Sequence, residues 1–266
     1  MRPYSILFGA LLLAGCAQER IQVFNTASVR QSLSPDQWVF ESDSVVVSYS
    51  FYASEGVMAF SVYNTSSRPL YIDWKKSSFI YNGAKYDYWE SVEVSQASTT
   101  GTMQGVSAQS LDWGWMRSST IASYGFSSSS TASVSRRAQQ VVFVPPHSYL
   151  DHAQFKLYPS EQFAFNKAET KVVKESRSDK PKALTSVAQQ EFDQSNSPLR
   201  FRNYLAIGWD ENVSNPVFID HEFWLSSVRE MELRHFRGKS TGFDDKGERQ
   251  YPRPFRTKKS FYIKLQ

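Results

Sequence analysis

The residues best suited to acid–base or metal chemistry are histidines with carboxylates beside them. Asp151 precedes His152, and Asp220 and Glu222 flank His221. Hydrolases and zinc sites use such imidazole–carboxylate sets. In a strand, however, neighbouring side chains point to opposite faces, so Asp220 and Glu222 would share one side and His221 would occupy the other. No His-Glu-x-x-His or comparable ligand spacing occurs. We therefore expect no catalytic residue, no metal and no cofactor, and a hydrolase using Asp220, His221 or Glu222 is the second alternative.

Three short motifs fail as nucleotide, ester or calcium sites. Gly238-Lys239-Ser240-Thr241 ends like a phosphate-binding loop, but Leu233 stands where the first glycine is required. Gly125-Phe126-Ser127 lacks the second glycine of a nucleophile elbow. The segment Asp244-Asp245-Lys246-Gly247-Glu248 lacks the alternating ligands of a calcium loop. It predicts instead a turn with Gly247 in the left-handed conformation.

Two tryptophans favour a different kind of site. Trp113 and Trp115 lie within residues 95–139, a stretch dominated by serine and threonine that is too polar for a core strand. Aromatic rings held on a polar surface can stack on sugars, whereas the other tryptophans suit a β-sandwich core. A glycan-binding surface module that uses Trp113 and Trp115 is therefore the first alternative.

Cys16, the single cysteine of the 266-residue chain, indicates covalent lipid chemistry. Leu13-Ala14-Gly15-Cys16 follows Arg2 and an apolar run, and it resembles the lipobox of bacterial lipoproteins. The run is much shorter than the ~20 apolar residues of a transmembrane helix. The resemblance implies that residues 1–15 are a cleaved signal peptide and that Cys16 carries the lipid. Ala17 stands where an inner-membrane retention signal has Asp, which favours anchoring in the outer membrane.

Charge is unevenly distributed along the chain. The formal net charge is +4, yet residues 234–259 contain nine Lys and Arg against three Asp and Glu. Such a segment suits nucleic acid or acidic lipid, and export argues against nucleic acid. A solvated hairpin loop and strand edge is our main interpretation. Contact with anionic head groups or surface polysaccharide is the alternative.

Alternating apolar residues predict an all-β chain. Strands are expected from Trp38, over 45–51, 57–63, 70–74, 78–81 and 85–89, then over 140–144, 149–158, 201–209, 217–225, 232–236 and 260–266. Glu55-Gly56 and Asn82-Gly83 are tight-turn signals between neighbouring strands. Strands recurring about every 12 residues, without helical periodicity between them, favour an antiparallel sandwich.

The remaining segments are predicted to be irregular. Residues 16–35 are expected to be the lipidated cysteine and a flexible tether, and the β-sandwich domain is expected over 36–266. Two long loop insertions are predicted within that domain: a Ser/Thr-rich one over 95–139 and a charged one over 166–198. Within the second, residues 183–192 are the one plausible helix.

Four blocks of sequence together resemble a family of uncharacterised lipoproteins and exported proteins of the Bacteroidota: Asn64–Trp74, Val142–Ser148, Phe201–Leu205 and Phe218–Trp224. The first block is also similar to structural elements of bacterial immunoglobulin-like domains. The resemblance implies an immunoglobulin-like β-sandwich at the cell envelope and no residue roles. Asp43-Ser44-Val45 resembles the O-glycosylation acceptor of the same bacterial group. The function we expect is a membrane-anchored, non-catalytic interaction or structural module.

Overall fold

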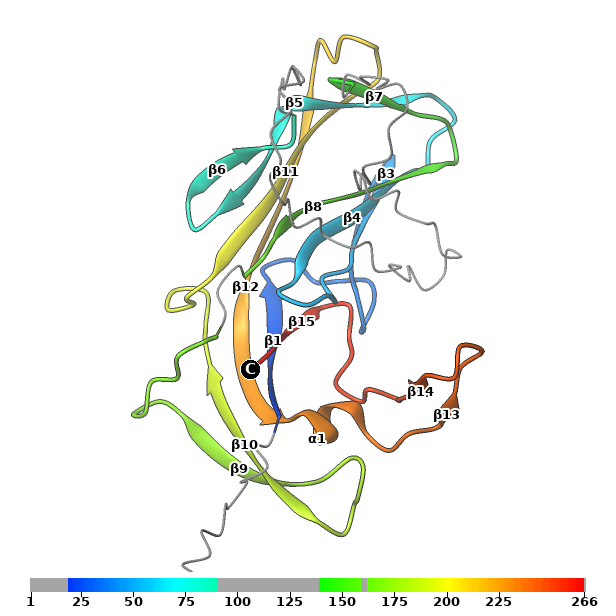
Figure 1. Ribbon diagram of the computed structural model, residues 1–266. Helices are drawn as coiled ribbons and strands as arrows, with labels where there is room; N and C mark the ends of the chain where they lie inside the picture. Colours follow the sequence, from blue (N-terminus) through cyan, green and yellow to red (C-terminus); the bar gives the residue numbers. More distant parts are fainter. Residues whose placement is uncertain (1–18, 90–138, 159–161, 266) are drawn as a thin grey trace, which may run out of the picture.

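Strands of alternating apolar residues build two packed antiparallel sheets. The computed structural model describes residues 19–89, 139–158 and 162–265 (Figure 1). The strands are β1 (Arg20–Ser28), β2 (Trp38–Ser42), β3 (Val45–Tyr49), β4 (Val57–Asn64), β5 (Leu70–Tyr81), β6 (Ala84–Asp87), β7 (Val141–Val144), β8 (Tyr149–Lys156), β9 (Lys171–Ser176), β10 (Leu184–Glu191), β11 (Arg200–Gly208), β12 (Val217–Glu232), β13 (Gly242–Phe243), β14 (Arg249–Gln250) and β15 (Ser260–Lys264). Within these ranges the one helix is α1 (Leu233–Arg237). The predicted all-β antiparallel sandwich is confirmed.

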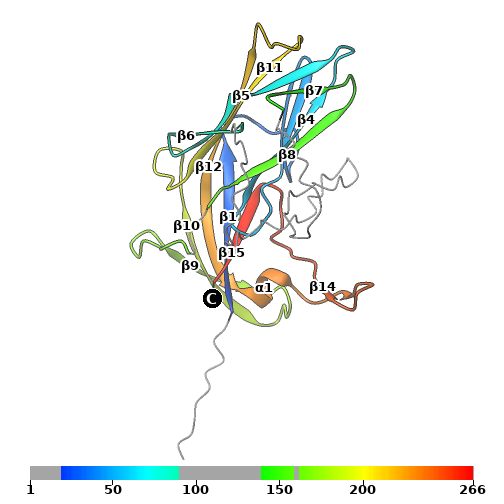
Figure 2. The same ribbon diagram turned by 45° about the horizontal axis from the view of Figure 1, so that its top comes forward.

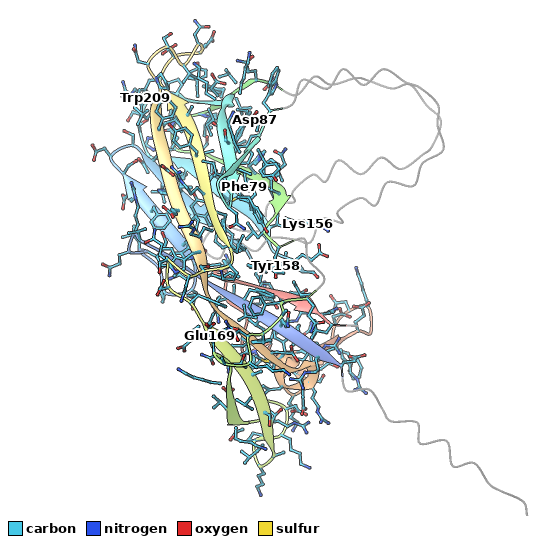
Figure 3. The ribbon with its side chains drawn as sticks, turned by 90° about the vertical axis from the view of Figure 1, so that its left-hand side faces the viewer. Phe79, Asp87, Lys156, Tyr158, Glu169 and Trp209 are labelled. Atoms are coloured by element: carbon cyan, nitrogen blue, oxygen red, sulfur yellow. The ribbon has the colours of Figure 1, made fainter. Side chains whose placement is uncertain are left out.

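The larger sheet follows the order β15-β1-β12-β11-β5-β6, with β7 added to β5 and the β10–β9 hairpin added to β12. The smaller sheet has the order β2-β3-β4-β8. Strand β12 is the longest and runs from the sandwich end of the molecule to the opposite end, where α1 follows it (Figure 1). Trp209 lies at the sandwich end, and Glu169 lies beside the β9–β10 hairpin (Figure 3). We call the end that contains α1, the β9–β10 hairpin and the start of β1 the lower end.

Turn residues fix the predicted hairpins. Asn82 and Gly83 both have positive φ, 46° and 85°, as a two-residue hairpin turn requires, and they join β5 to β6. Gly56, with φ 66°, lies between β3 and β4, and a Cβ there would stand 2.7 Å from the Phe261 ring. Both the backbone conformation and the close packing therefore require glycine at position 56.

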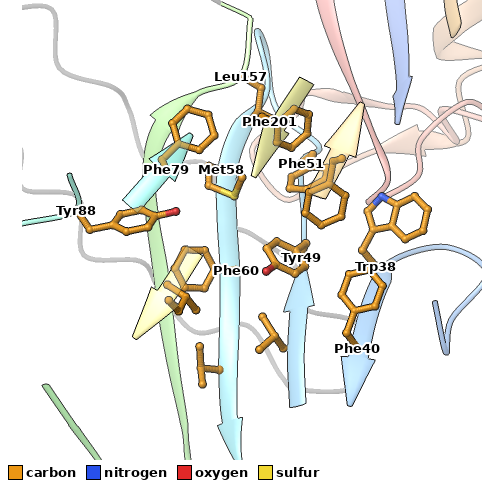
Figure 4. Close-up of a cluster of buried hydrophobic side chains, with 14 of the residues drawn as sticks. Trp38, Phe40, Tyr49, Phe51, Met58, Phe60, Phe79, Tyr88, Leu157 and Phe201 are labelled. Carbon is orange, nitrogen blue, oxygen red and sulfur yellow. The ribbon is translucent and has the colours of Figure 1, made fainter. Parts of the chain in front are cut away.

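Buried aromatic residues fill the space between the two sheets. Tyr49, Phe60, Phe201 and Phe223 are all without exposed surface, and Figure 4 shows the first three packed with their neighbours from both sheets. A second, smaller cluster lies at the lower end and is formed by Ile21, Val23, Val187, Met231, Leu233, Phe236 and Tyr262. The two clusters lie along the same strands, so the lower end is tied to the sandwich core.

The predicted flexible tether over 16–35 is wrong for its central part. Residues Arg20–Ser28 form β1, which pairs with β12 on one side and β15 on the other. Ile21 and Val23 face the lower cluster, whereas Phe24 packs in the main core. The polar Gln22 between Ile21 and Val23 interrupts the run of apolar residues, so the sequence did not indicate a strand here. It is buried because its amide bonds the backbone N–H and C=O of Phe163, at 2.8 and 2.9 Å.

The charged insertion over 166–198 and its helix are also wrong. Strands β9 and β10 form a hairpin here, and β10 pairs with β12 from Ala188 to Glu191. Alanine and glutamine favour a helix locally. Burial of Thr185 and Val187 on one face of the hairpin, together with pairing to β12, overrides that preference.

Three further expectations differ from the structure or lie outside the described residues. The strand expected over 232–236 is replaced by α1, because β12 ends at Glu232 and the chain turns to bury Leu233 and Phe236. The strands expected over 70–74 and 78–81 are one continuous strand, β5. The insertion over 95–139 lies almost entirely outside the described residues.

Truncating Phe24 tests whether the first strand belongs to the core. Phe24 is fully buried and stacks on Phe261 with ring centroids 4.8 Å apart. We expect Phe24→Ala to lower the free energy of unfolding by about 3–5 kcal/mol, measured by urea denaturation. Val29→Ala, one residue beyond the strand and 67% exposed, should change it by less than about 0.5 kcal/mol. Equally small effects of Phe24→Ala and Val29→Ala would indicate that residues 20–28 are a tether and not part of the core.

Candidate functional site

A cleft of about 660 Å³ at the lower end is lined by ten residues, of which four are Arg or Lys and two are acidic. Its wall comes from α1 and the chain that follows it, from the start of β1 and from the β9–β10 turn. The lining residues are Glu19, Asp179, Leu233, Arg234, Arg237, Gly238, Lys239, Ser240, Arg249 and Tyr251. We call this the basic cleft. Figure 2 shows α1, β14 and β9 gathered at the end where β1 begins.

Gly238 and two prolines shape one side of the basic cleft. Gly238 ends α1 with φ 74°, and a Cβ there would lie 2.9 Å from Cγ of Pro252. The Arg253 N–H donates to the Arg237 carbonyl at 3.0 Å. These contacts hold the β13–β14 arm (residues 239–251) against the helix. Gly247 at the tip of the arm has φ 77°, which confirms the predicted turn.

The charges of the basic cleft are only partly neutralised. Asp179 accepts two hydrogen bonds from Arg177, at 3.0 and 2.5 Å, and these bonds lower the pKa of the Asp179 carboxyl. Arg234 pairs with Glu232. For Arg237, Lys239 and Arg249, by contrast, no carboxylate in the described part of the chain lies within ion-pair distance; Arg237 and Arg249 lie over aromatic rings instead.

The basic cleft is fixed directly beside the first described residue. The Leu233 N–H donates to the Glu19 carbonyl at 2.9 Å, so the chain enters the fold at the start of α1. Cys16 is three residues earlier in the sequence and lies outside the described residues. A fully extended chain spans about 3.5 Å per residue, so three residues reach about 10 Å. Whatever is attached to Cys16 is therefore joined to the protein close to the basic cleft.

His221, the histidine of the hydrolase alternative, belongs to a buried polar chain between the sheets. Tyr88 donates to the Asn203 carbonyl at 2.8 Å, Asn203 donates to the Tyr49 oxygen at 3.0 Å, and Tyr49 donates to Nδ1 of His221 at 2.8 Å. Figure 4 shows the Tyr49 and Tyr88 hydroxyl groups directed toward the space between them. When Tyr49 donates to Nδ1, the neutral ring carries its proton on Nε2. Burial lowers the pKa of His221 to about 3.

The carboxylates beside His221 lie on the other face of β12, as predicted. Asp220 forms a two-point ion pair with Arg202 on the neighbouring strand. Glu222 accepts a hydrogen bond from Gln194 at 3.2 Å. Asp220, His221 and Glu222 are therefore not brought together, and the arrangement that the hydrolase alternative needs is not formed by these three residues.

A Ser–His–Glu arrangement that the sequence did not indicate surrounds His235. Its Nδ1 lies 3.0 Å from the Ser178 N–H and 3.2 Å from the Ser178 hydroxyl, and its Nε2 lies 3.4 Å from Glu175. The backbone N–H occupies the lone pair that a general base would use, and Arg229 pairs with Glu175 at 2.5 Å. His235 therefore joins the β9–β10 turn to α1. A separation of 57 residues between Ser178 and His235 leaves no local motif to find.

The remaining candidates are dispersed or lie outside the described residues. His152 packs between Trp74 and Phe60 and hydrogen-bonds Gln154, and burial lowers its pKa to about 4. Ser44 of the Asp43-Ser44-Val45 motif lies at the β2–β3 turn and is half-buried. Trp113 and Trp115 lie outside the described ranges.

Neither a metal-binding group of side chains nor a membrane-spanning helix is found in the described ranges. No group of three His, Cys, Asp or Glu side chains there is placed to hold a metal ion. No helix in the described part of the chain has the length and apolar character needed to cross a membrane.

Comparison with known proteins gave no match: no family model, no curated protein and no solved structure is similar to this chain.

The buried polar chain predicts acid sensitivity. An unfolded histidine has a pKa of about 6.5, and the folded His221 has a pKa of about 3. The unfolded state therefore binds more protons between these values, and stability falls as the pH decreases through that window. His221 contributes a loss of about 2 kcal/mol between pH 7.5 and pH 5, and His152 acts in the same direction.

His221→Gln tests this prediction by urea denaturation at pH 7.5 and pH 5. The variant should lose about 2 kcal/mol less than the wild type over this interval. His147→Asn is the control, because the exposed His147 side chain changes its surroundings little on unfolding. Asparagine also tolerates the positive φ of 54° at that position. An unchanged pH dependence in His221→Gln would show that the buried ring does not titrate as described.

Proposed function

We propose that this chain is a lipid-anchored envelope protein that acts as a non-catalytic interaction or structural module at the outer membrane. Residues 1–15 act as the signal peptide, and Cys16 receives the lipid. The observation that carries the proposal is the direct entry of the chain into β1. Glu19 is bonded to α1, and β1 from Arg20 lies between two strands of the larger sheet.

The position of β1 makes the link between lipid and fold short. Only Ala17 and Gln18 separate Cys16 from the first described residue. The three residue steps from Cys16 to Glu19 span about 10 Å when extended, so the lower end is held near the bilayer surface. The sandwich then extends away from the membrane, in keeping with a protein that presents its far end to partners.

Exposed apolar side chains at the sandwich end support an interaction role. Phe143, Tyr149, Val217 and Phe218 are each at least 41% exposed. They belong to β7, to the start of β8 and to the start of β12, all far from α1 in Figure 1. These exposed apolar groups are available for contact with another macromolecule.

The resemblance to Bacteroidota lipoproteins fits this proposal and adds no residue role. The glycan-binding alternative depends on Trp113 and Trp115. It would be favoured if the purified protein bound surface polysaccharide and lost binding in Trp113→Ala. Hydrolysis of an ester or glycan by the purified protein would favour the enzyme alternative. Recovery of an envelope protein after crosslinking in intact cells, without either activity, supports the interaction role.

Lipidation is tested by mass spectrometry of the N-terminal peptide from protein extracted from membranes. We expect a mature chain that begins at Cys16 and carries acyl mass on that residue. Cys16→Ser should retain residues 1–15 and incorporate no alkyne-labelled fatty acid. Gln18→Ala, two residues away, should be processed and labelled like the wild type. An unmodified Cys16 in the membrane-extracted wild type would refute the anchor.

A further inference from the structure

We propose that the basic cleft and the surfaces beside it rest on anionic lipid head groups of the membrane that holds the Cys16 lipid. The inference deepens the proposed function and depends on it only for the orientation of the protein. The binding partner is a phosphate-bearing bilayer surface, which the cleft contacts directly. The inference is supported independently by the positive charge of the lower end, by its distance to Cys16 and by its exposed apolar side chains.

The first observation is the set of cations without carboxylate partners. Arg237, Lys239 and Arg249 line one cleft, and no described acidic group neutralises them. Two acidic residues also line the cleft: Asp179 is already paired with Arg177, and Glu19 is not within ion-pair distance of these three cations. A basic residue held near an anionic bilayer contributes about 1 kcal/mol to binding. Three such residues therefore supply about 3 kcal/mol, which corresponds to roughly a hundredfold in affinity.

The second observation is that the positive charge is concentrated at the lower end. The β9–β10 hairpin adds five Lys and Arg against two acidic residues over 171–184, next to the nine against three over 234–259. These two segments carry net charges of +3 and +6. Because the whole chain carries +4, the remaining residues carry a net charge of −5. An anionic surface would attract the lower end and repel the rest, so the charge pattern itself orients the molecule.

The third observation is the distance to the anchor. The backbone of Glu19 is bonded to Leu233 in the wall of the basic cleft, and Cys16 is at most about 10 Å away along an extended chain. The Debye length at physiological salt is about 8 Å. The link is comparable in length to the Debye length, so the anchor leaves the cations free to reach the head groups without holding them far from the membrane.

The fourth observation favours a bilayer over a free anion. Phe243 on the β13–β14 arm is 66% exposed, and Leu184 and Val172 of the β9–β10 hairpin are 66% and 67% exposed. Exposed apolar side chains among lysines and arginines are the composition of surfaces that lie in a membrane interface. A soluble phosphate would use the cations and leave these side chains in water.

Vesicle co-sedimentation of the unlipidated chain 17–266, which contains every described strand, tests the proposal without the anchor. The wild type should bind vesicles of 30% phosphatidylglycerol in phosphatidylcholine and should not bind phosphatidylcholine alone. The triple variant Arg237→Glu, Lys239→Glu, Arg249→Glu should bind at least tenfold more weakly. The matched control Arg68→Glu, Lys85→Glu, Arg200→Glu makes the same charge change on exposed residues at the sandwich and should stay within twofold of the wild type.

Each other outcome overturns a specific part of the proposal. Equal losses in both triple variants would show attraction by net charge alone, and no binding by the wild type would exclude the head groups. Cleft-dependent binding of an anionic polysaccharide, with no binding to vesicles, would assign the basic cleft to a surface glycan. Circular dichroism and melting temperature establish that each variant is folded.

A label placed on the arm distinguishes insertion from simple adsorption. The chain 17–266 has no cysteine, so Phe243→Cys accepts a single environment-sensitive fluorophore. Its emission should shift to shorter wavelength on phosphatidylglycerol vesicles, and a label at Tyr149→Cys at the sandwich end should not change. Loss of lipid on Cys16 would leave these results intact, so failure of the anchor and failure of the cleft are separable.

Discussion

The pairing of β12 along both of its edges is the constraint on which the rest of the structure depends. Its first half pairs with β11, and its second half lies between β1 and β10. The strand contributes Phe223 and Leu225 to the main core and Met231 to the lower cluster. One continuous element thus carries both cores, and it fixes the basic cleft relative to the sandwich. A shift of one residue in its register would exchange its buried and exposed faces.

The buried polar chain adds specificity to this packing. Tyr49 is in the smaller sheet, whereas His221 and Asn203 are in the larger sheet, so the hydrogen bonds join the two layers at one relative position. Apolar packing alone tolerates small shifts between layers, but each donor in this chain has a single geometrically suitable acceptor. The cost is that the imidazole must stay neutral, because a second proton on the ring would remove the acceptor that Tyr49 needs.

The sequence was sufficient to predict elements whose signals are local. Alternation and turn residues located β3 to β6 and β11, and the opposite orientation of His221 and Asp220 followed from strand geometry alone. Strands β1 and β10 were missed because their evidence is non-local: Gln22 is satisfied only by the distant Phe163, and β10 becomes a strand by pairing with β12. The sequence showed the basic segment 234–259, but it did not show that this segment forms a cleft with residues from elsewhere in the chain. The residues of the basic cleft come from positions 19, 179, 233–240 and 249–251, and only the sheet order brings them together.

Strand β1, near the start of the chain, lies in the larger sheet between β12 and the C-terminal β15. The chain is synthesised from its N-terminus, and Ser28 at the end of β1 pairs with Phe223, 195 residues further on. Contacts of such sequence separation form slowly. Strand β1 therefore stays unpaired until residues 223–232 of β12 are available. Once β12 and β15 have been added, β1 is paired along both of its edges, so completion of the larger sheet joins the two ends of the described chain.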